Sequence, residues 1–136
     1  MVFATVSLTP FMVGPGCLDA LGDPGSTVQN ITPAEAYALI QENQGNDKFV
    51  FLDVRNPEEY AAGHIDGAEN VCLNCVEDFA MAVIDRGRDS TYLIYCRSGN
   101  RSATASAVMA GLGFANIYNM TGGMNAWAAA GYPVAQ

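Results

Sequence analysis

The sequence predicts an α/β domain with a central, mostly parallel sheet and helices on both faces. Short apolar runs alternate along the chain with segments of helical periodicity, and short connections join them. The runs at 49–52 and 91–95 are rich in aromatic and aliphatic residues, which is typical of strands buried on both faces. Alternation of strands and helices with short connections implies parallel strands and right-handed crossovers.

The first half of the chain contains clear helix signals. A capping box at 32–35, with proline at the first helical position, predicts a helix. The apolar face of this helix carries Ala36, Leu39 and Ile40. After the strand at 49–52, residues 56–59 predict a short second helix that ends at Gly63.

The second half predicts further strands and helices. Residues 70–73 are expected to form a short strand, and Asn74 with Glu77 resembles the start of a third helix. After the strand at 91–95 we expect a helix over about 100–112, a strand at 116–119 and a last helix from near Gly123. In such a sheet, ligands bind beyond the carboxyl ends of the strands, which directs attention to Cys96 and to residues 53–55.

Composition limits the classes of function. The chain has 136 residues, a formal charge of −8 and 50% hydrophobic residues, which fits one folded domain. The acidic balance argues against nucleic acids and anionic membranes as partners. The single lysine is Lys48, and the five arginines lie between Arg55 and Arg101, so a bound anion must be held by a local site.

We expect an apolar N-terminal extension and linker at 1–27 and the folded domain at 28–136. Residues 1–17 carry no charge, lack the basic start of a secretory signal, and are too short and broken by Pro and Gly for a membrane span. Either the segment packs on the domain, for instance as an edge strand, or it is the end of a trimmed export signal in which Cys17 resembles a lipid-attachment site. A cytoplasmic location is the default expectation, and a periplasmic or lipid-anchored one is the alternative.

The segment from Cys96 to Ser102 joins a strand to a helix and combines several features of a reactive site. A helix N-terminus lowers the pKa of a cysteine thiol, and Gly99 allows the loop to curl with its N–H groups pointing inward. Such a ring of donors binds an anion, while Arg97 and Arg101 add positive charge. A buried structural cysteine is the alternative. The candidate site comprises Cys96, Arg97, Ser98, Gly99, Asn100, Arg101 and Ser102.

Four ordered segments resemble the signatures of rhodanese-like sulfurtransferases. Together they cover about residues 30–133. The segments are FLDVRNPEEY at 51–60, GHIDGA at 63–68, CRSGNRS at 96–102 and GGMNAW at 122–127. The chain departs from the family at Asp66, where a proline is frequent.

This resemblance implies a rhodanese-like three-layer fold and covalent sulfur transfer. Cys96 would be the nucleophile that carries a persulfide, and the backbone of residues 97–102 would cradle the anion. Asp53 and Arg55 would support the loop from behind. The implied substrates are a small anionic sulfur donor such as thiosulfate and a cyanide, thiol or protein acceptor. No cofactor or metal is implied.

Two other functions remain open from the sequence. Cysteine-dependent phosphatases and arsenate reductases share the cysteine, the curled loop and the arginine, but they place five residues between cysteine and arginine. Here four residues separate Cys96 from Arg101, a smaller ring that suits a single sulfur atom. The second alternative is a persulfide relay between proteins, which would use the same Cys96 chemistry, or a thiol-redox protein that uses Cys72 and Cys75. Rhodanese-like binding modules usually lack the cysteine.

Cys72 and Cys75 form a C-x-x-C motif outside the matched segments. Three interpretations of this pair are open. The two cysteines are structural, or they form a disulfide or act as a resolving thiol for Cys96, or they are half of a zinc site that Cys17 and His64 would complete. His64 is the only histidine, and we interpret it as a packing residue of its turn, with acid–base chemistry as the alternative.

Overall fold

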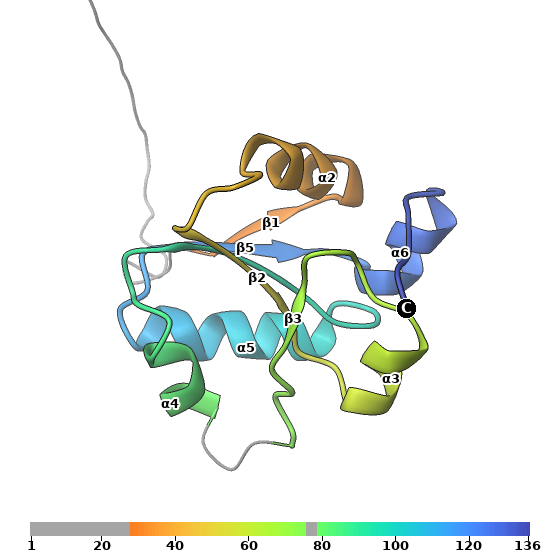
Figure 1. Ribbon diagram of the computed structural model, residues 1–136. Helices are drawn as coiled ribbons and strands as arrows, with labels where there is room; N and C mark the ends of the chain where they lie inside the picture. The colour runs from red at the N-terminus through yellow and green to blue at the C-terminus, as the bar shows by residue number, and fades with distance from the viewer. Residues whose placement is uncertain (1–27, 76–78) are drawn as a thin grey trace, which may run out of the picture.

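A computed structural model describes residues 28–75 and 79–136 of the chain. Five parallel strands form one sheet in the order β1-β5-β4-β2-β3 (Figure 1). The strands are β1 (Val28–Ile31), β2 (Phe49–Asp53), β3 (Glu69–Asn70), β4 (Thr91–Tyr95) and β5 (Asn116–Met120). The helices are α2 (Pro33–Glu42), α3 (Pro57–Ala62), α4 (Phe79–Ile84), α5 (Asn100–Gly111) and α6 (Gly123–Ala129). The predicted parallel α/β sheet is confirmed.

The sheet is covered on both faces, as Figure 1 shows. Along β4, Tyr92 and Ile94 join the cluster under α4 and α5, whereas Leu93 and Tyr95 join the cluster under α2 and α6. All four are fully buried, because successive side chains of a strand point to opposite faces. β4 is therefore a rigid central strand, and it holds the residues beyond its carboxyl end firmly in place.

The segment after β2 differs from the prediction. The expected strand at 70–73 is replaced by the two residues of β3 (Glu69–Asn70), and the expected helix start at Asn74 is a turn; the described helix that follows is α4 (Phe79–Ile84). A disulfide between Cys72 and Cys75 accompanies a tight turn at the residues where an extended strand and a first helical turn were expected.

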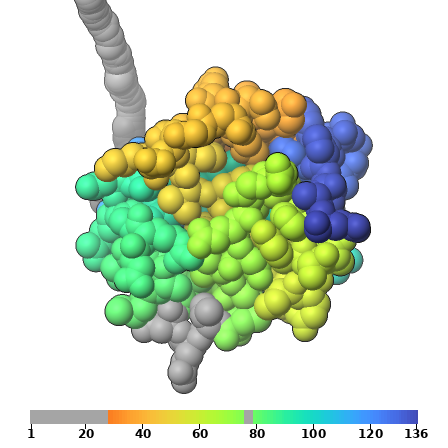
Figure 2. Space-filling model, in the orientation of Figure 1, coloured from red at the N-terminus to blue at the C-terminus, as the bar shows by residue number. Residues whose placement is uncertain are grey.

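Different contacts hold the two ends of the described domain in place. β1 was not predicted, and it pairs with β5 at the edge of the sheet, where the Asn119 side chain donates to Asn30. The C-terminal residues return to α3, since Ala135 pairs with His64 and the Gln136 side chain donates to Ala62 (Figure 2). The expected packing of residues 1–17 and the site at Cys17 lie outside the described residues.

Over the described ranges, no helix has the length and apolarity needed to cross a membrane.

Candidate active site

Cys96 directly follows the central strand β4 and is buried, with 1% of its surface exposed. It is a free cysteine. The next three residues turn into α5, so the sulfur lies at the N-terminus of a twelve-residue helix. The predicted strand–loop–helix setting is therefore present.

The loop surrounds the Cys96 sulfur with hydrogen-bond donors. The backbone N–H of Gly99 donates to Sγ at 3.1 Å. Burial alone would raise the pKa of the Cys96 thiol, but hydrogen bonds from the Ser102 side chain and from the backbone N–H groups of Ser102, Gly99 and Ser98 outweigh it and lower the pKa. The arrangement therefore favours a thiolate.

Gly99 and Ser102 shape this ring. Gly99 has φ of +112°, a conformation that other residues avoid, and it ends the curl as the N-cap of α5. Ser102 is fully buried on the first turn of α5, and its hydroxyl lies 3.3 Å from the carbonyl oxygen of Gly99. Its one proton either donates to that carbonyl, which braces the loop, or donates to the sulfur, which stabilises a thiolate.

The start of α6 holds the loop from behind, a role that the sequence did not reveal. The backbone N–H of Met124 donates to the Cys96 carbonyl at 2.8 Å, and that of Asn125 donates to the Arg97 carbonyl at 3.0 Å. A Cβ on Gly123 would lie only 2.3 Å from the Cys96 oxygen, so the backbone at the start of α6 and the backbone of the Cys96 loop approach each other as closely as glycine allows. With these carbonyls held outward, the loop N–H groups face the sulfur. The adjacent glycines Gly122 and Gly123 are the signal that could have indicated this contact.

The two arginines of the loop differ in their surroundings. Arg101 donates two hydrogen bonds to the Glu59 carboxylate, at 2.8 and 3.1 Å, and its guanidinium is thus already paired. This pairing holds the pKa of Glu59 down, to about 2. Arg97 is exposed, and no ion pair in the described part of the chain involves it. Arg97 is therefore the loop cation open to an incoming anion, whereas the expected donor contact of Arg101 is replaced by an ion pair with α3. Asn100 is also exposed.

Asp53 and Arg55 form a buried ion pair at the end of β2. The Arg55 guanidinium donates to Asp53 at 2.7 Å and to the Gly63 carbonyl, and it lies over the Tyr95 ring. Asp53 pairs with Tyr95 across the strands, one residue before Cys96. The pair thus supports the strand that leads to the cysteine.

Cys72 and Cys75 are joined by a disulfide, and whether this pair is structural or acts on Cys96 remains a prediction. No cluster of three or more metal-ligating side chains occurs among residues 28–75 and 79–136. His64 stacks on Tyr60, with ring centroids 3.9 Å apart, and its Nδ1 lies 3.0 Å from the Tyr60 carbonyl oxygen. This geometry fits the packing role predicted for His64.

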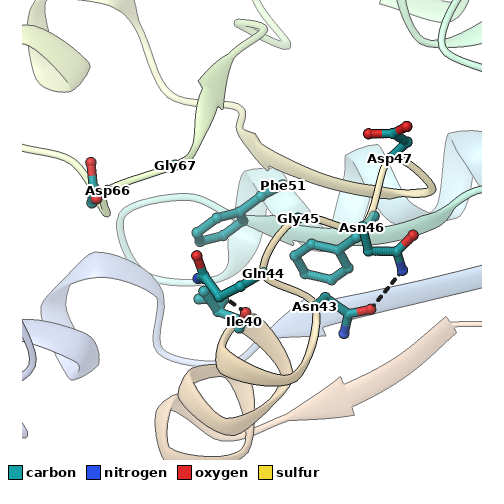
Figure 3. A pocket seen from close by; sticks show the side chains of 10 residues that line it. Ile40, Asn43, Gln44, Gly45, Asn46, Asp47, Phe51, Asp66 and Gly67 are labelled. Atoms are coloured by element: carbon teal, nitrogen blue, oxygen red, sulfur yellow. Dashed lines mark hydrogen bonds between the residues drawn. The ribbon is translucent and has the colours of Figure 1, made fainter.

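Two cavities differ in their position relative to this site. One of about 290 Å³ opens between the end of α2, the start of β2 and the turn at Asp66, beside Phe49 rather than beyond the strand ends (Figure 3). The other, of about 270 Å³, lies between α3 and α6 and is lined by Arg55, Glu59 and Met124 among others. The second adjoins the Cys96 loop through the contacts of Glu59 and Met124.

A family model, the rhodanese-like domain, matches residues 32–130. The chain belongs to the rhodanese-like family. The resemblance seen in its four motifs is thereby confirmed, and so is the rhodanese-like fold. The proposed domain boundary at residue 28 remains a prediction.

The chain is similar to curated proteins and to solved structures. Thiosulfate sulfurtransferase GlpE of Pseudomonas entomophila is 37% identical over 102 residues, covering 75% of this chain and 86% of the relative. A rhodanese-related protein from Thermoplasma volcanium has a similar structure, with 32% identity, a TM-score of 0.64, and coverage of 79% and 97%. A Rhodopseudomonas palustris protein of unknown function, described as a possible tyrosine phosphatase, has 26% identity, a TM-score of 0.65, and coverage of 79% and 85%.

Proposed function

We propose that this chain is a thiosulfate sulfurtransferase that works through a persulfide on Cys96. The observation that carries the proposal is the ring of donors around the buried Cys96 sulfur, which lowers its pKa at the carboxyl end of β4. A relative 37% identical to this chain is named a thiosulfate sulfurtransferase. The ring of donors and the relative together indicate the substrate class.

The reaction divides into two displacements. The Cys96 thiolate attacks the outer sulfur of thiosulfate, the S–S bond of the donor breaks, and sulfite leaves with the bonding electron pair. The persulfide formed on Cys96 carries its charge on the outer sulfur, where the inward N–H groups of the loop stabilise it. An acceptor such as cyanide or a thiol then attacks that outer sulfur and restores the thiolate.

The charged residues near the loop have roles that their surroundings indicate. Exposed Arg97 attracts the anionic donor, since its guanidinium has no ion pair within the described residues. Arg101 acts indirectly, by fixing the first turn of α5 to α3 through Glu59. Asp53 and Arg55 keep β2 and β4 in register behind the loop.

The thiosulfate:cyanide assay tests this function. Wild-type protein should form thiocyanate and sulfite in equal amounts, and Cys96→Ser should abolish both, because the serine hydroxyl cannot carry a sulfane sulfur. A Ser106→Ala variant is the matched control, since Ser106 lies on the same helix and its hydroxyl has no hydrogen-bond partner within the described residues. Equal thiocyanate formation by wild type and Cys96→Ser would contradict the proposal.

Phosphatase activity is the alternative to exclude, because one structural relative is described in those terms. A phosphate-binding loop needs an arginine directed at the anion. Here Arg101 is paired with Glu59, and only four residues separate it from Cys96. We expect no hydrolysis of an aryl phosphate, and hydrolysis that requires Cys96 would favour the phosphatase.

A further inference from the structure

The Cys72–Cys75 disulfide lies beyond the carboxyl ends of the strands, at the same end of the sheet as Cys96. Val54 connects the two, because its N–H donates to the Tyr95 carbonyl at 3.0 Å and its carbonyl accepts from the Leu73 N–H at 3.1 Å. Tyr95 precedes Cys96, and Leu73 follows Cys72. The two cysteine-bearing segments are thus two strand spacings apart, about 10 Å between their backbones.

Asn56 contacts the disulfide directly and is connected to the Cys96 loop through Glu59. Its side-chain oxygen lies 3.4 Å from the Cys72 sulfur and 3.8 Å from the Cys75 sulfur. Its backbone N–H donates to Glu59 at 3.0 Å, and the same carboxylate holds Arg101 of the loop. The C-x-x-C turn is therefore connected to the loop that carries the candidate nucleophile through Asn56, Glu59 and Arg101.

The two cysteines of the pair differ in their exposure to solvent. Cys72 is buried, with 4% exposed, whereas Cys75 is exposed. In dithiol chemistry an accessible thiolate attacks a sulfur of the partner, and a second thiol then attacks the bond just formed and completes a disulfide. The exposed Cys75 suits the first role and the buried Cys72 suits the second. Reduction would also remove the covalent link that closes the turn at residues 72–75.

We propose that the reduced Cys72 and Cys75 form an internal dithiol acceptor that takes the sulfur from Cys96 and releases it as sulfide. This inference rests on the proposed persulfide at Cys96. The outer sulfur of that persulfide extends about 2 Å beyond Sγ, and the transfer requires Cys75 to cross the remaining distance once reduction has opened the turn. The disulfide in the structure is then the oxidised product of the reaction.

The steps balance in atoms and electrons. The Cys75 thiolate attacks the outer sulfur of the protonated Cys96 persulfide, and Cys96 leaves as a thiolate. The Cys72 thiolate then attacks the Cys75 sulfur that is bonded to the transferred atom, forms the disulfide and expels hydrosulfide. The transferred sulfur gains the two electrons that the dithiol loses, and an external thiol reductant regenerates the dithiol.

The test uses the full chain carrying Cys17→Ser, which removes the remaining cysteine. The protein is reduced with a phosphine, separated from the reductant and mixed with one equivalent of thiosulfate per chain, without another acceptor. We expect sulfite, one equivalent of sulfide per chain, and a final mass lower by two hydrogens, because the disulfide has formed. The same protein with its disulfide left oxidised should release sulfite but retain the mass of one added sulfur.

Variants separate this inference from the proposed function. Cys72→Ser/Cys75→Ser should release sulfite, no sulfide, and keep the added sulfur. The inference is wrong if the reduced chain keeps the sulfur with both thiols free, and the proposed function then still stands. It is also wrong if Cys96→Ser releases sulfide, since the dithiol would then act on thiosulfate directly. No sulfite from any chain would overturn the proposed function itself.

Discussion

The backbone N–H of Met124 donates to the carbonyl oxygen of Cys96 at 2.8 Å, so the last helix fixes the residue that we propose as the nucleophile. The contact requires the close approach of Gly123, whose φ is +55°. A carbonyl held in this way cannot rotate toward the sulfur. The loop N–H groups are therefore oriented before any substrate arrives.

Gly123→Ala should damage this orientation. The new Cβ would lie 2.3 Å from the Cys96 oxygen and 2.6 Å from the Arg97 carbonyl carbon, so the loop must move. We expect thiocyanate formation to fall roughly 100-fold, as for other misplacements of about 1 Å in an active site. Gly111→Ala is the matched control, because nothing lies within 4 Å of its added Cβ. Equal activity of the two variants would show that the α6 contact does not orient the loop.

Ser102→Ala should raise the pKa of the Cys96 thiol. The Ser102 side chain is the first of the hydrogen bonds that lower this pKa against the effect of burial. The rate of Cys96 alkylation, measured against pH in a Cys17→Ser background, should reach its midpoint at a higher pH in the variant. Ser106→Ala is the control, since this buried hydroxyl has no hydrogen-bond partner within the described residues. An unchanged midpoint in Ser102→Ala would exclude the serine from thiolate stabilisation.

Much of this site could be predicted from the sequence, because its signals are local. A strand, a cysteine, a glycine and a helix start within a few residues indicate the Cys96 loop without tertiary information. The ion pair between Arg101 and Glu59 and the contact of Met124 with Cys96 could not be predicted, since they join segments far apart in the chain. The short β3 and the turn at residues 73–75 were missed because the pairing of Cys72 with Cys75 cannot be deduced from local propensity.

Glu59→Gln should lower the free energy of unfolding by roughly 0.5 to 1 kcal/mol at pH 7, as for partly exposed ion pairs. The folded-state pKa of Glu59 is lowered to about 2, below its ordinary value of 4.5. The stabilisation is therefore complete above about pH 4.5 and is lost as the pH falls toward 2. Urea unfolding at several pH values measures it. Glu58→Gln, in the same helical turn, is the control because Glu58 forms no ion pair within the described residues, and an equal loss of stability in both variants would contradict this role of Glu59.

Asp53→Asn should destabilise the protein by about 3 to 5 kcal/mol, because it leaves the buried guanidinium of Arg55 without its counter-charge. A second substitution, Arg55→Met, should recover part of this loss. Urea unfolding of the two single variants and the double variant gives the coupling free energy. Additive losses would show that the two side chains do not stabilise each other.

The most direct test of the account is the location of the transferred sulfur. Wild-type protein with its disulfide intact is incubated with thiosulfate, freed of small molecules, digested without reductant and analysed by mass spectrometry. We predict the mass of one added sulfur on the peptide that contains Cys96, and its complete removal by cyanide with formation of thiocyanate. An unmodified Cys96 peptide, in protein that still forms thiocyanate from thiosulfate and cyanide, would contradict the persulfide mechanism.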